Sequence, residues 1–61
     1  MEKTAMDTFT AVMIAEGEEE ASEERQIEAW QLLHDSGLAY QLQGWFGRQA
    51  KALIEAGIIT A

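Results

Sequence analysis

Apolar residues recur along this chain at the three- and four-residue spacing that places side chains on one side of an α-helix. The first such stripe consists of Ala5, Met6, Phe9, Val12 and Met13. Thr4 and Asp7 have the spacing of a capping box at a helix start, and Gly17 suits the left-handed residue that follows a helix end. The pattern therefore predicts a first helix over about residues 5–16.

A second apolar stripe follows an acidic stretch. Its members are Ile27, Ala29, Trp30, Leu32 and Leu33. Ser22 is a preferred N-cap residue, and Glu23 and Glu24 come directly after it, where the helix dipole favours anions. Gly37 suits the position after the helix end. We predict a second helix over residues 23–35, and because its stripe spans more than half the circumference, this helix should lie between two neighbours.

A third apolar stripe crosses two glycines. At 100° per residue it keeps in phase through Leu38, Leu42, Phe46, Ala50 and Leu53. This phase predicts one continuous helix over about residues 38–56, and the alternative is a turn over residues 38–43 before a helix over residues 45–56. Gly44 and Gly47 each cost a helix about 1 kcal/mol relative to Ala, so we expect another backbone or a ligand to approach them closely.

Together the patterns predict an all-α fold, a single three-helix domain over residues 1–61 with an acidic link at about residues 17–21. A chain of 61 residues buries a small core, and with no Cys it has no disulfide to stabilise it. Self-association offers further stability, because the apolar positions of the first two helices exceed what one small core holds. We therefore expect a homodimer.

Charge is concentrated in the first half of the chain. Residues 1–28 hold nine acidic residues and two basic ones, which gives them the whole net charge of −7, and residues 29–61 are neutral. Because nucleic-acid binding depends on Lys and Arg, duplex nucleic acid is not an expected partner. No apolar run approaches the roughly 20 residues of a membrane span, and the N-terminus lacks a secretory signal pattern, so we expect a cytoplasmic protein that does not enter a membrane.

Residue types that carry catalytic chemistry are sparse. His34 and Asp35 are adjacent, so they point about 100° apart on a helix and cannot form a catalytic dyad with each other. The glutamates around Gly17 lack the ordered spacing of a calcium or magnesium loop, and a single His without any Cys builds no zinc site. We predict that the protein is not an enzyme and has no metal site and no cofactor.

The segment QLQGWFGRQAK, residues 41–51, is the candidate binding region. On a continuous helix its glycines share one face with a tyrosine and two cations, and Trp45 stands at the boundary of that face. Trp, Tyr and Arg are the residues that dominate the energetics of protein interfaces. The predicted binding residues are Tyr40, Gly44, Trp45, Gly47, Arg48 and Lys51.

The stretch HDSGLAYQLQGWFGRQAKALIEAG resembles the C-terminal signature of a family of short acidic proteins of unknown function, encoded mainly by bacteriophages. The resemblance covers about residues 14–57. The matching positions are Gly37, Leu42, Gln43, Gly44, Gly47, Arg48 and Gly57. Trp45 and the tail Ile-Ile-Thr-Ala depart from the family pattern. The resemblance implies a phage origin, a location in the host cytoplasm and an all-helical fold, but it implies no activity.

Three functional hypotheses remain open. The leading one is an interaction protein, a helical homodimer that binds a host protein and modulates its activity, with an acidic half that steers it towards a basic partner. The alternative is a sequestering protein for a nucleotide signal, in which Tyr40 or Trp45 stacks on the base and Arg48 binds the phosphate. The third is a structural homodimer without other activity.

Overall fold

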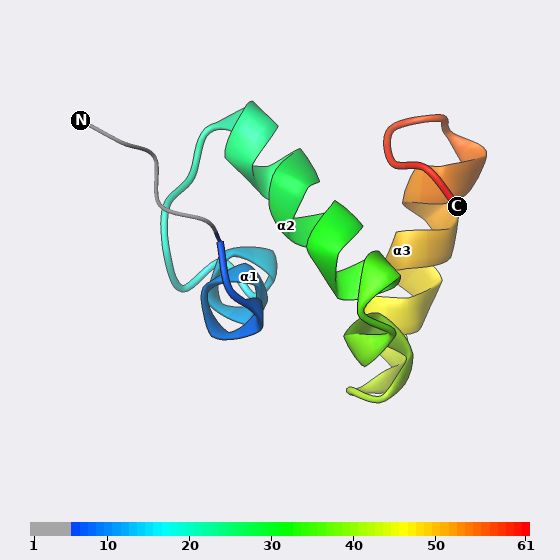
Figure 1. Ribbon diagram of the computed structural model, residues 1–61, viewed down its shortest axis with the longest axis horizontal. Coiled ribbons are helices and arrows are strands. Elements are labelled where there is room, and N and C mark those ends of the chain that lie inside the picture. The colour runs from blue at the N-terminus through cyan, green and yellow to red at the C-terminus, as the bar shows by residue number, and fades with distance from the viewer. Residues whose placement is uncertain (1–5) are drawn as a thin grey trace.

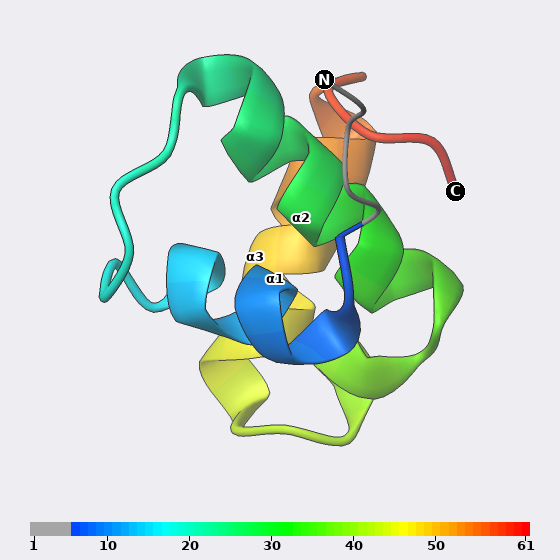
Figure 2. The same cartoon turned by 60° about the vertical axis from the view of Figure 1, so that its left-hand side comes forward.

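The computed structural model describes residues 6–61, and these residues form three α-helices and one short 3-10 helix (Figure 1). The elements are α1 (Thr8–Ala15), α2 (Glu23–Asp35), the 3-10 helix η1 (Leu38–Tyr40) and α3 (Gly44–Glu55). The described part of the chain contains no strand, so the predicted all-α class is confirmed. In Figure 1 α2 lies between α1 and α3, and Figure 2 shows the molecule with α1 turned to the front.

α1 is shorter at its start than the predicted helix over residues 5–16. It begins at Thr8 because the Asp7 carboxylate caps it, accepting a hydrogen bond from the Thr10 backbone N–H at 2.9 Å. Met6 and Asp7 lie outside the helix, and Thr4, the cap predicted from the sequence, lies outside the described residues. The helix ends as predicted before Gly17, which has φ 81° and donates its N–H to the Ile14 carbonyl.

α2 has the predicted bounds. Ser22 is its N-cap, and the Ser22 hydroxyl accepts a hydrogen bond from the Arg25 backbone N–H at 3.2 Å. Gly37 follows the helix end with φ 81°, a left-handed conformation that a residue with a β-carbon adopts only under strain. The chain therefore reverses direction at Gly37 and enters η1, which packs against both α2 and α3.

The chain does not form the continuous helix predicted over residues 38–56. After η1 it turns, Gln43 takes the extended conformation φ −59°, ψ 152°, and α3 begins at Gly44, so the predicted alternative with a break at Gly44 is the observed one. The turn reverses the chain, so that α3 leads away from η1 and diverges from α2 in a V (Figure 1). Leu38 and Leu42 still pack against the core from this turn, which explains why the apolar phase continues through the break.

The core lies where the three helices and η1 meet. Leu33 and Phe46 are its largest fully buried side chains. Alanines are buried beside them on each of the four elements, and these small residues let the elements approach closely. The buried alanines are Ala11, Ala29, Ala39 and Ala50. Ile14, Trp30 and Ile59 complete the core, so the C-terminal tail is part of the packed structure.

The C-terminal tail is fixed to α2 by Gln31. The Gln31 amide group donates to the Thr60 carbonyl oxygen and accepts from the Thr60 backbone N–H, each at 2.8 Å. These two hydrogen bonds join positions 29 residues apart in the sequence. They hold the buried Ile59 side chain against the core.

Candidate interaction surfaces

Tyr40, the first of the predicted binding residues, connects η1 to its two neighbouring helices. Its hydroxyl group shares a hydrogen bond of 2.6 Å with Nδ1 of His34 on α2, and the two rings meet edge-on at 5.6 Å. On its other side the Tyr40 ring lies against Gly47 of α3. About half of the side chain remains exposed, so Tyr40 is both a structural contact and a surface residue.

The two glycines of α3 are approached closely by this chain's own atoms. A β-carbon built on Gly47 would lie 3.4 Å from Tyr40 Cδ1 and 3.6 Å from the Ala39 carbonyl oxygen. A β-carbon on Gly44 would lie 3.1 Å from Arg48 Nη1, the end of a flexible side chain. The atoms nearest to these glycines therefore belong to η1 and to Arg48, and at Gly47 the distances are ordinary van der Waals contacts that a methyl group could make.

Trp45 belongs to an aromatic cluster on the opposite flank of α3. Its ring stacks on Phe46 with centroids 4.0 Å apart and meets Trp30 of α2 edge-on at 6.2 Å. Its indole N–H donates a hydrogen bond to Gln43 Oε1 at 3.1 Å. These contacts fix the orientation of a tryptophan that is still one-third exposed.

The predicted binding residues of α3 spread over a wide arc of the helix surface. At 100° per residue, Gly47 and Trp45 lie on opposite flanks of α3, because they are about 200° apart. Arg48 and Lys51 are exposed on the outer side between these flanks. Tyr40 lies against Gly47, whereas Trp45 stacks on Phe46, so the two aromatic rings stand on different flanks of α3.

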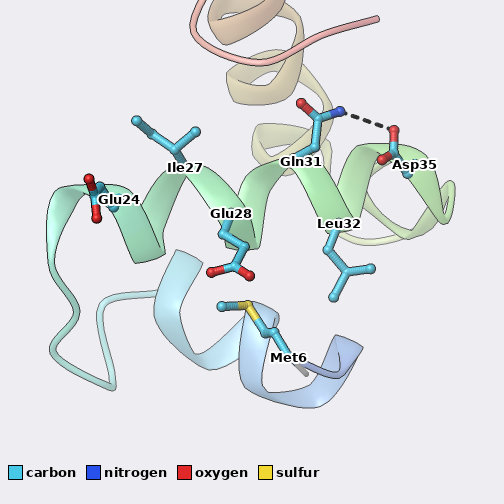
Figure 3. Close-up of a pocket in the computed structure, with 7 residues that line it drawn as sticks. All are labelled: Met6, Glu24, Ile27, Glu28, Gln31, Leu32 and Asp35. Carbon is cyan, nitrogen blue, oxygen red and sulfur yellow. Dashed lines mark hydrogen bonds between the residues drawn. The ribbon is translucent and has the colours of Figure 1, made fainter. Parts of the chain in front are cut away.

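A groove that sequence analysis did not identify runs along the open side of α2, and we call it the α2 groove (Figure 3). Its volume is about 670 Å³, and its lining residues are Met6, Glu24, Ile27, Glu28, Gln31, Leu32 and Asp35. The apolar members are half-buried and the three carboxylates are exposed. Figure 3 shows Leu32 and Glu28 pointing from α2 towards Met6, with Ile27 on the other side of the groove.

A smaller cavity lies between the first half of α2 and the second half of α3. Its volume is about 220 Å³, and its lining residues are Glu23, Gln26, Ile27, Trp30, Gln49, Leu53 and Ile58. Ile27 also lines the α2 groove, so the two depressions meet at this side chain. The cavity is smaller than the about 300–1,000 Å³ of a typical small-molecule site, and its size suits one inserted side chain.

α1 is apolar on both of its sides. Ala11 and Ile14 are buried against α2 and Val12 packs at the edge of the core, whereas Phe9 and Met13 follow at helical spacing on the opposite side. Phe9 is the most exposed large apolar residue of the described chain, and the helix sequence TFTAVMIA contains no charged residue. We call the side formed by Phe9 and Met13 the outer side of α1.

Asp7 is the titratable group whose pKa the structure clearly shifts. The backbone N–H of Thr10 stabilises the carboxylate, and the Thr10 side chain adds to this effect, so the pKa of Asp7 lies below its ordinary value of 3.8. The charged form of Asp7 is therefore the form that caps α1.

Comparison with known proteins identifies the family. The profile of a domain of unknown function, DUF7417, matches residues 3–61. The chain belongs to the DUF7417 family. No curated protein and no solved structure matches the chain. The DUF7417 family carries no assigned activity, so the chemistry of the surfaces is the basis for any functional proposal.

Two further observations concern chemistry that the described residues could support. None of the helices in residues 6–61 has the length and apolar character that crossing a membrane requires. In the same part of the chain, no group of three or more His, Asp or Glu side chains is arranged to hold a metal ion. 

The residues that line the α2 groove on α2 share a pattern in the sequence. Glu24, Ile27, Glu28, Gln31, Leu32 and Asp35 recur at the spacing of one helix face. Their mixture of apolar and acidic residues resembles a solvated face unless the neighbouring elements are known. Phe9 was assigned to the buried stripe of the first helix, but Ala11 and Ile14 take that role because they face α2.

Proposed function

We propose that this DUF7417 protein is an interaction protein of phage origin that binds a host protein in the host cytoplasm and modulates its activity. One observation carries the proposal: four large apolar side chains are exposed, Phe9 at 72%, Tyr40 at 48%, Ile58 at 45% and Trp45 at 36%. An exposed apolar patch on a small protein is typical of a protein-binding surface, and Phe9 on the uncharged helix α1 and the oriented Trp45 are the two positions that support this proposal.

Trp45 has the properties of an interface anchor. It is held by Phe46, Trp30 and Gln43, so binding would cost it little conformational entropy. Trp30 also lines the cavity between α2 and α3, which places a side-chain-sized depression beside the exposed indole. An exposed, pre-oriented tryptophan next to such a depression is a common arrangement at energetic hot spots.

The outer side of α1 supports the homodimer part of the proposal. Phe9 lies on a helix without charge, and a second copy could cover it with the same side of its own α1. This contact would leave the acidic residues at the periphery. If the protein makes this homodimer contact and binds no other partner, it is a structural homodimer without another activity.

The nucleotide-binding alternative has less support from the described surfaces. Neither the α2 groove nor the cavity between α2 and α3 contains Tyr40 or Arg48. The three carboxylates of the α2 groove would repel phosphate. Melting-temperature shifts against a panel of nucleotides test this alternative, and a shift that Arg48→Ala abolishes would favour it over protein binding.

The proposed function is tested with the immobilised protein in a host lysate. A captured host protein is purified, and its affinity is measured for the wild type, for Phe9→Ser, for Trp45→Ala and for Glu55→Gln as an exposed control. We expect at least one of the first two variants to weaken binding about tenfold or more, as hot-spot residues do, and the control to have no effect. Retention of the captured protein by all variants with equal affinity would contradict the proposal.

A further inference from the structure

The cavity between α2 and α3 lies where these two helices diverge. At the start of α3 the pair is joined by the aromatic rings of Trp30, Trp45 and Phe46, which contact one another. Towards the start of α2 and the end of α3 the helices separate, and Figure 1 shows the open end of the V there. The side chains of this part do not close the space, so a cavity of about 220 Å³ remains.

The lining residues of the cavity share one side of each helix. Those on α2 fall within an arc of about 100° at 100° per residue, and those on α3 are one helical turn apart. They are Glu23, Gln26, Ile27 and Trp30 on α2, and Gln49 and Leu53 on α3. Ile58 of the C-terminal tail borders the same space, so two helices and the tail enclose it.

Apolar surface of the cavity is still in contact with water. Ile27 and Leu53 are half-buried, and Ile58 is exposed. These three side chains come from α2, from α3 and from the tail, so they border the cavity on different sides. An apolar side chain inserted between them would remove the surface of all three from water, which is favourable.

Trp30 brings a hydrogen-bond donor to the cavity. Only 8% of this residue is exposed, yet its indole N–H donates to no atom of residues 6–61, whereas the indole N–H of Trp45 donates to Gln43. No side-chain nitrogen or oxygen atom in that part of the chain is both buried and without a hydrogen-bond partner. The indole N–H of Trp30 therefore belongs to the small accessible part of the residue, and Trp30 lines the cavity.

Glu23 places a carboxylate at the open end of the cavity. It is the first residue of α2 and lies one turn before Ile27 on the same side of the helix. It is exposed and forms no ion pair with residues 6–61. Gln26 and Gln49, the other polar lining residues, are uncharged. A cation of a partner seated in the cavity would therefore meet one available carboxylate.

Size and charge select the occupant. A volume of about 220 Å³ is below the about 300–1,000 Å³ of a typical small-molecule site and suits one inserted side chain. Glu23 and the net charge of −7 oppose nucleotides, nucleic acids and anionic membranes. The same charges attract a segment that carries a cation next to its inserted side chain. A second copy of the chain could offer Phe9 from its uncharged α1, but it brings the same net charge of −7.

We infer that this cavity binds a short segment of a partner protein, with one leucine-sized apolar side chain inserted and a Lys or Arg beside it. This inference rests on the proposed function, for which it names the chemistry of the partner. The inserted side chain packs against Ile27, Leu53 and Ile58. A backbone carbonyl group of the segment accepts the hydrogen bond from the Trp30 indole, and the cation pairs with Glu23.

The test uses the capped peptide Ala-Lys-Leu-Ala at millimolar concentration. Two control peptides have alanine in place of the leucine, or glutamate in place of the lysine. Nuclear magnetic resonance follows the indole N–H signals of the isotope-labelled wild type, and Trp45→Phe assigns the Trp30 signal, because the chain has two tryptophans. Affinity is also measured for Glu23→Gln and for its matched control Glu24→Gln, which removes the same charge at the next residue, outside the cavity.

We expect the peptide to shift the Trp30 indole signal and to bind about tenfold more tightly than the alanine control, since the leucine buries more apolar surface. Glu23→Gln should weaken binding about threefold, as the loss of one exposed ion pair does. Glu24→Gln should weaken it by less than about 1.5-fold, because salt screens charges that make no direct contact. Circular dichroism of both variants should match the wild type, since both side chains are exposed.

Several outcomes would overturn the inference. A Trp30 signal that does not move, or equal affinity for the leucine and alanine peptides, would show that no side chain enters the cavity. Equal losses in Glu23→Gln and Glu24→Gln would show attraction by net charge alone. Shifts that appear with protein concentration, without peptide, and vanish in Phe9→Ser would make a second copy the occupant.

The same experiment separates this inference from the proposed function. A protein that captures a host partner through Phe9 or Trp45 but does not bind the peptide loses only the cavity as a site. Peptide binding at the Trp30 indole without any host partner contradicts the proposed function.

Discussion

The ring of Tyr40 lies against the backbone of α3 at Gly47, where a β-carbon would stand 3.4 Å from Tyr40 Cδ1. This is an ordinary van der Waals distance, so the two residues are in contact without a clash. Through Tyr40, η1 packs on α3 while the Tyr40 hydroxyl group reaches His34 on α2. One turn of 3-10 helix thereby joins two α-helices.

Gly47→Ala should stabilise the protein by up to about 1 kcal/mol, because alanine favours the helix and its methyl group finds room against Tyr40. Gly47→Leu is the matched variant, and it should destabilise the protein because a larger side chain must displace Tyr40. Chemical denaturation of both variants measures the difference. A destabilising Gly47→Ala accompanied by weaker self-association would show instead that another chain packs at this position.

Tyr40→Phe should destabilise the protein by about 1 kcal/mol, because it removes the hydrogen bond to His34 while it keeps the ring against Gly47. The double variant with His34→Ala should lose less than the sum of the two single variants, as expected for residues that interact directly. Thermal melts of the two single variants and the double variant give this coupling. Strictly additive losses would mean that the hydrogen bond contributes nothing to stability.

Asp7 should make the stability of α1 depend on acid pH. Its folded-state pKa is lowered, chiefly by the Thr10 backbone N–H, so its contribution is present above the unfolded pKa and is lost as pH falls through the folded pKa, below about 3.8. Asp7→Asn keeps a capping oxygen but does not titrate there. The difference in melting temperature between wild type and Asp7→Asn should therefore change on acidification. A difference that stays constant from neutral to acid pH would contradict this role.

Gln31→Ala should release the C-terminal tail, since it removes both hydrogen bonds to Thr60. We expect a loss of about 1 kcal/mol in the free energy of unfolding and faster amide hydrogen exchange at Thr60. Glu55→Gln, at an exposed position on α3, is the control and should leave the exchange unchanged. Protection of Thr60 that survives in Gln31→Ala would show that Ile59 burial alone holds the tail.

Self-association should depend on Phe9. If the outer side of α1 forms a homodimer, sedimentation at micromolar concentration gives a mass near twice 6.8 kDa for the wild type and near 6.8 kDa for Phe9→Ser. Phe9→Ser should remain folded, because the side chain is outside the core. A folded wild-type monomer at these concentrations would rule out the dimer.

Local signals predicted the parts of the fold that depend on local chemistry. Ser22 and the two glutamates after it define the start of α2, and Gly37 defines its end, because caps act within one turn of the helix. The break before α3 could not be read from periodicity. Leu38 and Leu42 pack against the core from a turn, as they would from a helix. The spacing of the apolar residues along the sequence is therefore the same for a broken and a continuous helix.

The candidate surfaces were predicted less completely for a related reason. Sequence indicated that Tyr40 and Trp45 would be at the surface, and both are exposed. It did not indicate that Tyr40 lies on η1, where it contacts His34 of α2 and Gly47 of α3. The α2 groove depends on which sides of α2 are covered by α1 and α3, and only the packing of all three helices determines that. From the sequence alone, a helix face that carries both carboxylates and aliphatic residues can be either solvent-exposed or part of a groove. The positions of the neighbouring helices decide between the two.

The edge-on contact of Trp30 with Trp45 gives the protein an internal optical reporter. These are the two tryptophans of the chain, and they lie on different helices with ring centroids 6.2 Å apart. Indoles at this separation couple electronically, so the near-ultraviolet circular dichroism should contain a band that vanishes when α2 and α3 separate. Titrations and unfolding can then be followed on the unlabelled protein, with a signal that originates at the junction of two helices.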